Sequence, residues 1–145
     1  MVNIEILRPE HIAGVHTLET LCFPEPWSER SLGLLCTGDN FGVVVTVDGF
    51  VAAYGGMTCV LDEGAITNIA THPDYRRQGH GRAVVTAMLE EAKNRGIENV
   101  FLEVRASNEA ARALYLSTGF SELCVRKGFY RHPMEDAIQM VYRKN

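Results

Sequence analysis

The amino-acid sequence predicts a single α/β (α+β) domain over residues 1–145, in which helices flank a mixed, mostly antiparallel sheet of about seven strands. Runs rich in β-branched and aromatic residues alternate with segments of helical periodicity. Asp48-Gly49 joins two of these runs, as in a tight hairpin. A length of 145 residues suits one core and leaves little room for a second domain. The expected order of elements is β-α-α-β-β-β-α-β-α-β-β.

The first elements are a short strand and two helices. Apolar and polar residues alternate from Val2 to Ile6, which predicts the strand. Pro9 is suited to open a helix that runs to about Cys22. Ser28 is placed to cap the next helix, with Trp27 before the cap and Leu32 in the first turn as a hydrophobic staple.

Three antiparallel strands are expected next. Phe41 to Val47 and Phe50 to Val60 form the hairpin, and Ala65 to Thr71 forms the third strand. A helix from Gly81 to Arg95 follows, with Gly96 as its natural stop. The remaining elements are strand Asn99 to Arg105, helix Glu109 to Ser117, strands Phe120 to Lys127 and Ala137 to Arg143, and a loop from Phe129 to Pro133 between those strands.

A basic, glycine-containing loop precedes the third helix, with the sequence Arg76-Arg77-Gln78-Gly79-His80-Gly81-Arg82. Glycines allow close approach of backbone N–H groups, and the helix N-terminus adds unpaired donors and positive dipole. A nucleotide triphosphatase is disfavoured because Arg82-Ala83 stands where a P-loop has Lys-[Ser/Thr]. Val84 at the helix packing position argues against a dinucleotide fingerprint. The loop therefore indicates a pyrophosphate site, the alternative being a plain helix-entry turn.

Composition limits the partners. A net charge of −4 makes nucleic acid an unexpected partner, and no apolar run approaches membrane-spanning length. We expect a cytoplasmic protein, a monomer, with no membrane association. The histidines lack metal-ligand spacing, so no metal is expected. The four cysteines form no Cys-x-x-Cys pair and are expected to be buried, reduced thiols: Cys22, Cys36, Cys59 and Cys124.

Arg76 to Gly81 fits the pattern Arg/Gln-x-x-Gly-x-Gly/Ala, and in this respect the chain resembles the GNAT N-acetyltransferase superfamily. Further runs resemble its RimI-like branch, which acetylates the N-terminal alanine of a small-subunit ribosomal protein. These runs are Phe23 to Ser28, Asn68-Ile69-Ala70, Leu102 to Asn108, Ala113-Leu114-Tyr115 and Glu135-Asp136-Ala137. One departure is Phe129-Tyr130, where relatives tend to carry paired tyrosines.

The resemblance implies a GNAT fold and acetyl-CoA as the cosubstrate. The strand around Ile69 would then splay from the strand around Glu103, and the pantetheine arm would enter between them. Backbone groups of Ile69, Ala70 and Thr71 would pair with that arm, and the basic loop would hold the pyrophosphate. Asn108 is expected to touch the cosubstrate. It is equally suited to cap a helix, and both roles are compatible because capping uses only the side-chain oxygen.

Glu103 and Tyr115 are the candidate catalytic residues. Glu103 shares one strand face with Phe101 and Arg105, which indicates either a solvated strand end or a polar cleft. The resemblance places the general base at Glu103. Tyr115 lies among Ala111, Leu114 and Leu116, a setting typical of core packing. A phenol with a pKa of about 10 is also able to protonate a departing thiolate, so Tyr115 is hypothesised to be the general acid.

The acceptor is expected to be an α-amine. At neutral pH, deprotonating lysine costs roughly 3 to 4 kcal/mol more than deprotonating an N-terminus, and one carboxylate suffices for the latter. Backbone N–H groups near Ile69 and Ala70 are candidates to stabilise the developing oxyanion. No nucleophile has a setting for a covalent acyl-enzyme, so direct transfer in a ternary complex is expected.

Trp27 and Tyr130 are expected to form walls that receive the acceptor's N-terminus, although the staple explains Trp27 equally well. Two other functions remain open on sequence grounds. One is acetylation of another N-terminus, a lysine or a small amine, because the fold alone does not select the acceptor. The other is a non-catalytic acyl-CoA-binding module, which would need neither Glu103 nor Tyr115.

Overall fold

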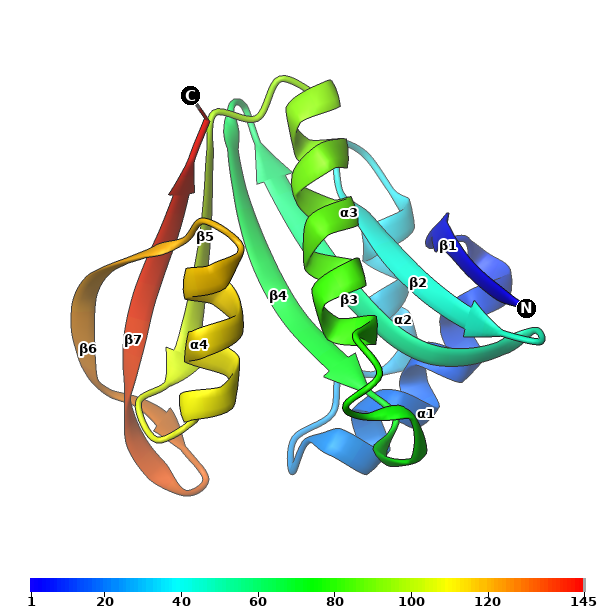
Figure 1. Ribbon diagram of the computed structural model, residues 1–145, viewed down its shortest axis with the longest axis horizontal. Coiled ribbons are helices and arrows are strands. Elements are labelled where there is room, and N and C mark those ends of the chain that lie inside the picture. Colours follow the sequence, from blue (N-terminus) through cyan, green and yellow to red (C-terminus); the bar gives the residue numbers. More distant parts are fainter. Residues whose placement is uncertain (145) are drawn as a thin grey trace.

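A computed structural model describes residues 1–144, and its seven strands form one sheet in the order β1-β2-β3-β4-β5-β7-β6 (Figure 1). The strands are β1 (Val2–Ile6), β2 (Phe41–Val47), β3 (Phe50–Val60), β4 (Glu63–Thr71), β5 (Asn99–Arg105), β6 (Ser121–Arg131) and β7 (Met134–Arg143). The helices are α1 (Ile12–Cys22), α2 (Glu29–Gly33), α3 (His80–Asn94) and α4 (Glu109–Ser117). Only β4 and β5 pair in parallel; the other neighbouring strands are antiparallel. The predicted fold class and element order are confirmed.

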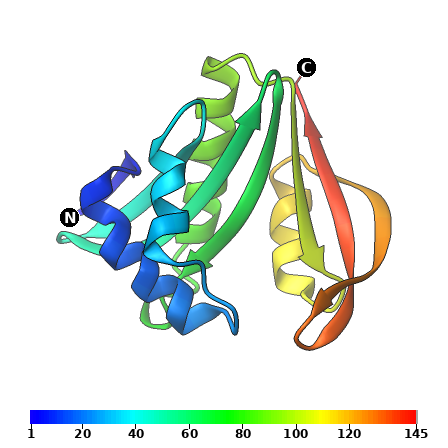
Figure 2. The same ribbon diagram turned by 180° about the vertical axis from the view of Figure 1, so that it is seen from behind.

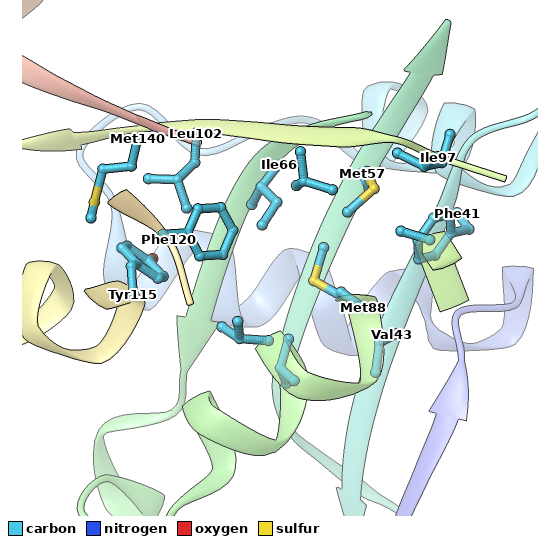
Figure 3. Close-up of a cluster of buried hydrophobic side chains, with 14 of the residues drawn as sticks. Phe41, Val43, Met57, Ile66, Met88, Ile97, Leu102, Tyr115, Phe120 and Met140 are labelled. Carbon is cyan, nitrogen blue, oxygen red and sulfur yellow. The ribbon is translucent and has the colours of Figure 1, made fainter. Parts of the chain in front are cut away.

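Helices cover both faces of the sheet. Figure 1 shows α3 and α4 on one face, and Figure 2 shows α1 and α2 on the other. Side chains alternate between the two resulting cores: Val43 and Val45 of β2 enter the core under α3, whereas Val44 enters the core under α1. Figure 3 shows the first core, in which Met88 of α3 and Tyr115 of α4 lie among side chains of the strands.

Of the two N-terminal helices, α2 begins at the predicted cap, whereas α1 has no side-chain cap and begins later than expected. Pro9 opens a short 3-10 turn, Pro9–His11, and the α-helix itself starts at Ile12. The Ser28 hydroxyl accepts a hydrogen bond from the Ser31 backbone N–H at 3.1 Å, as expected for an N-cap. Trp27 packs against the buried cluster that contains Leu32, which agrees with the staple.

The hairpin of β6 and β7 differs from the prediction. Phe129, Tyr130 and Arg131 belong to β6, and only His132-Pro133 lies between the strands, so the expected loop is mostly strand. The reason is a register shift between Arg126 and Tyr130. Gly128 adopts a φ of +63° there, and its N–H donates to Asp136 Oδ1 at 2.9 Å. This register shift is a β-bulge, and beyond it β6 and β7 pair again up to the tip of the hairpin.

The prediction for the cysteines was wrong in part. All four are free thiols, but only Cys59 is buried, Cys22 and Cys36 are half-buried, and Cys124 is exposed. Cys124 lies on β6, an edge strand whose residues are almost all exposed, so the small hydrophobic thiol has no core to enter.

The parallel pair of β4 and β5 is short. Its register covers Glu63↔Asn99, Gly64↔Val100 and Ala65↔Phe101, after which the two strands diverge (Figures 1 and 2). A bulge on β4 accompanies the divergence, since Thr67 and Asn68 lie opposite the single residue Gly56 of β3. The end of β4 is thereby separated from the end of β5.

Candidate active site

Two cavities lie at the divergence of β4 and β5 and meet at Tyr115. The first has a volume of about 510 Å³ and is lined by Glu103 and by the loop between α1 and α2. The second, of about 700 Å³, is lined by the basic loop, Arg76 to Arg82. Both cavities are bordered by Phe23, Ile69, Asn108, Ala111 and Tyr115. The structure therefore joins a chamber that contains the Glu103 carboxylate to a chamber lined by basic residues.

Glu103 lines the first cavity from β5. Val100, Leu102 and Val104 are buried on the opposite face, so the side-chain alternation expected from the sequence is observed. The Glu103 carboxylate is 24% exposed; its Oε2 accepts from Gln139 Nε2 at 3.1 Å and lies 3.7 Å from Arg126 Nη1. Because only one of its oxygens is engaged in this way, the carboxylate keeps capacity for a ligand's N–H.

Tyr115 lies in the core and at the junction of the cavities. Its side chain is 9% exposed, and its ring meets Phe120 edge to face at 5.9 Å. Burial raises the pKa of the phenol to about 12. The core and cavity roles considered from the sequence are thus compatible, because the ring packs inward and the residue still borders both chambers.

The basic loop turns sharply into α3. Gly79 is the N-cap residue with a φ of +82°, which favours glycine, and Arg77 also has a positive φ of 64°. Arg76 Nε donates to the Thr71 carbonyl at 3.3 Å, so this carbonyl is already occupied by a side chain. The His80 imidazole is 8% exposed. Arg77, Gln78 and Arg82, by contrast, are exposed. Arg77 and Arg82 line the second cavity, whereas Gln78, also expected at the cosubstrate site, does not.

Asn108 satisfies the capping role and borders both cavities. Its Oδ1 accepts from the Ala111 backbone N–H at 3.1 Å, which caps α4. The side-chain NH₂ group is not consumed by this contact. Both roles expected from the sequence are therefore geometrically possible for one side chain.

Trp27 and Tyr130 enter the first cavity from different elements, Trp27 from the loop between α1 and α2 and Tyr130 from the tip of β6. The Arg105 guanidinium lies 4.3 Å from the centroid of the Tyr130 ring. Burial is the main cause that raises the pKa of the Tyr130 phenol. Tyr130 is thus a packed neutral phenol at neutral pH.

Arg105 anchors the hairpin of β6 and β7. The sequence indicated only that it shares a strand face with Glu103. Its guanidinium donates to the carbonyls of Pro133 at 2.9 Å and His132 at 3.1 Å. Glu135 completes the anchor by accepting from the Ser107 N–H at 2.6 Å, and this bond and the Arg105 charge lower the pKa of the carboxyl. A charged pair at the end of a central strand was the signal available in the sequence.

A second missed group is Glu19 of α1, which is completely buried. It accepts hydrogen bonds from the Trp27 N–H, the Asn68 side chain and the Tyr54 hydroxyl. The sequence contained a signal for it: Glu19 follows Val15 by four residues and Ile12 by seven, so it occupies an apolar position of the helix.

Within residues 1–144, no cluster of three His, Cys, Asp or Glu side chains is arranged to hold a metal ion. In the same part of the chain, no helix combines the length and apolar character needed to cross a lipid bilayer.

Comparisons with known proteins identify a family model and several similar chains. Residues 12–120 match the model of the acetyltransferase (GNAT) family. The chain is 38% identical to the [ribosomal protein bS18]-alanine N-acetyltransferase of Escherichia coli K12, over 97% of this chain and 96% of that one. It is 37% identical to the protein of that name from Salmonella typhimurium, with the same shares covered. The crystal structure of the ribosomal-protein-S18-alanine N-acetyltransferase from Escherichia coli superposes with a TM-score of 0.90, covering 99% of this chain and 94% of that one.

Proposed function

The chain belongs to the acetyltransferase (GNAT) family, and on this premise we propose that it is a single-domain cytoplasmic enzyme that acetylates a protein N-terminus. The acetyl donor is acetyl-CoA, and the acceptor is the N-terminal alanine of a small-subunit ribosomal protein. The observation that carries the proposal is that the cavity containing Glu103 and the cavity lined by the basic loop meet at Tyr115. Identity to alanine N-acetyltransferases over nearly the whole chain supports the choice of acceptor.

The second cavity fits a coenzyme with a pyrophosphate and an extended arm. The N-terminal turn of α3 and the arginines of the loop supply donors and positive charge for phosphate oxygens. Beyond Ala65, β4 is no longer paired with β5, so Ile69 and Ala70 border the gap with backbone groups suited to strand-like pairing. Acetyl-CoA would bring an acetyl thioester to the junction of the cavities.

Glu103 is proposed as the general base. In the first cavity its carboxylate takes a proton from the acceptor's ammonium group, directly or through one water molecule. Gln139 and Arg126 hold the carboxylate in its orientation. An α-amine with a pKa of about 7.7 to 8.0 needs only modest assistance near neutral pH, whereas a lysine at about 10.4 needs much more.

Tyr115 is proposed as the general acid that donates its proton at the departing sulfur. With a pKa of about 12 the phenol holds its proton throughout the neutral range. Transfer from such a phenol to a thiolate whose conjugate acid has a pKa of about 8.5 would cost about 5 kcal/mol. The apolar surroundings that raise the pKa of Tyr115 also disfavour a thiolate in the same place and so raise the pKa of the thiol. The pKa difference between the phenol and the departing thiol is therefore smaller.

Thiol release from acetyl-CoA in the presence of short peptides tests the proposal. We expect rapid release with an Ala-initiated peptide that carries the ribosomal N-terminal sequence, and little with the same peptide blocked at its N-terminus. Release with an internal lysine or a polyamine instead would refute the choice of acceptor. Binding of acetyl-CoA without release would identify a non-catalytic module. Intact-mass measurement of ribosomal proteins from cells with and without the protein would identify the physiological acceptor.

A further inference from the structure

Glu19 is a buried carboxylate outside the reaction just described. Its exposure is 0%, although charged side chains are rarely buried without partners. Oε1 accepts from the Trp27 backbone N–H at 2.9 Å, and Oε2 accepts from Asn68 Nδ2 at 3.0 Å and from the Tyr54 hydroxyl. These donors come from three separate segments, so one carboxylate connects α1, β3, β4 and the loop after α1.

Two of the three donors belong to walls of the first cavity. Trp27 lies in the loop between α1 and α2, and Asn68 lies in the bulge of β4 opposite Gly56. Tyr54 lies in the core, where burial and the Glu19 charge raise the pKa of its phenol and keep it a donor. The carboxylate thus holds the loop between α1 and α2 against the bulge at which β4 diverges from β5.

The charge of Glu19 also decides which end of the Asn68 amide faces it. An ionised carboxylate only accepts hydrogen bonds, so the NH₂ end of Asn68 is directed to Glu19 and the oxygen is directed away. Asn68 is half-buried and lines the cavity that contains Glu103. Within residues 1–144, no hydrogen bond to Asn68 Oδ1 occupies that oxygen, which leaves it available to a ligand N–H.

We propose that Asn68 is an acceptor-binding residue whose side-chain oxygen receives an N–H from the amino end of the acceptor, and that Glu19 is the positioning residue that sets its orientation. The proposal rests on the proposed function and adds to it a specific recognition contact. A neutral α-amine has two N–H bonds and one lone pair. If Glu103 takes the excess proton, a second acceptor that holds one N–H would direct the lone pair toward the thioester.

Steady-state kinetics with separate variation of the peptide and acetyl-CoA test the pair. We expect Asn68→Ala to raise the KM for the Ala-initiated peptide about tenfold, the size of one hydrogen bond, and to change the KM for acetyl-CoA less than about twofold. Glu19→Gln should also raise the peptide KM. The NH₂ group of the new glutamine is a donor, so it allows the Asn68 side-chain amide to rotate and direct its oxygen toward residue 19 instead of toward the cavity. The double variant should be no worse than Asn68→Ala alone, since the two residues act through one contact.

Asn40→Ala is the matched control. Asn40 also bridges two segments, through Leu34 and Cys59, but lies outside both cavities. It should lower thermal stability and leave the peptide KM unchanged. A folded Asn68→Ala variant with a peptide KM within about twofold of the wild type, or additive effects of the two substitutions, would overturn the inference. If Asn68→Ala does not fold, Asn68→Ser and Glu19→Gln decide by the same comparison. A wild-type protein without turnover would refute the proposed function itself, and this inference with it.

Discussion

Replacing Glu103 with glutamine separates its proposed chemistry from its packing. A glutamine retains an oxygen that is able to accept from Gln139, which donates to the native carboxylate at 3.1 Å. The replacement loses the Arg126 pair, whose partners are 49% and 24% exposed, and such pairs contribute about 0 to 1 kcal/mol. We therefore expect Glu103→Gln to fold with nearly unchanged stability while kcat/KM falls about 100- to 10,000-fold, the range for loss of a general base.

The loss should shrink at alkaline pH by a limited amount. With a pKa of about 7.7 to 8.0, an α-amine is about 10 to 17% neutral at pH 7 and above about 90% neutral at pH 9. Solvent deprotonation is thus able to restore about five- to tenfold of the lost rate, and no more. The assay is thiol release from acetyl-CoA with an Ala-initiated peptide at both pH values, with unfolding by denaturant measured in parallel.

Glu122→Gln is the control for this substitution. Glu122 is also an ion-paired carboxylate, bonded to Arg112 at 2.7 Å, but it lies outside the cavities. Its replacement should leave kcat/KM unchanged. A Glu103→Gln enzyme that retains more than about a third of wild-type kcat/KM at pH 7 would refute the assignment of Glu103 as the base.

Three further predictions address the acid, the basic loop and the hairpin. Tyr115→Phe should lower kcat about 100-fold or more; in the wild type, because the Tyr115 pKa is about 12, pH profiles of kcat should show no loss from this phenol up to about pH 10. Gly79→Ala, at a φ of +82°, should cost about 1 to 2 kcal/mol in denaturant unfolding and raise the KM for acetyl-CoA. Glu135 has a lowered pKa, so its contribution to stability is present above the unfolded-state pKa and is lost as pH falls through the folded-state pKa. Thermal melts of Glu135→Gln should therefore show a weaker loss of stability under acidic conditions than melts of the wild type, and equal acid sensitivity would contradict this.

Local chemistry made most of the fold predictable. Ser28, Asp48-Gly49 and Asn108 carry signals that a few neighbouring residues complete, and the structure places a cap, a hairpin turn and a cap there. The β6–β7 tip was not predictable in this way. Its strand continues because Gly128 bonds to Asp136 of the partner strand, a contact that local patterns do not reveal.

The residues of the candidate site likewise fall into two groups, those that the local sequence indicates and those that only the fold brings together. Glu103 was visible as a charge in an apolar strand, and the basic loop was visible as a run of adjacent residues. Asn68 and Glu19 are 49 residues apart, and the contact between them is not evident until the fold joins them. Arg105 likewise depends on carbonyls of His132 and Pro133 that become neighbours only when β5 pairs with β7.

One geometric event explains why these residues occur together. Parallel pairing of β4 with β5 stops after Ala65, and the bulge that follows needs space beside β3. A Cβ on Gly56 would lie 2.6 Å from both Leu35 Cδ1 and Thr67 Oγ1, so a residue without a side chain is required there. Beyond the bulge, β5 has no strand on that side, and the charge of Glu103 reaches a cavity instead of an apolar core. Gly56, which accommodates the bulge, and Glu103, which lines the cavity beyond it, are therefore linked. A Gly56→Ala protein should lose both core packing and catalytic activity.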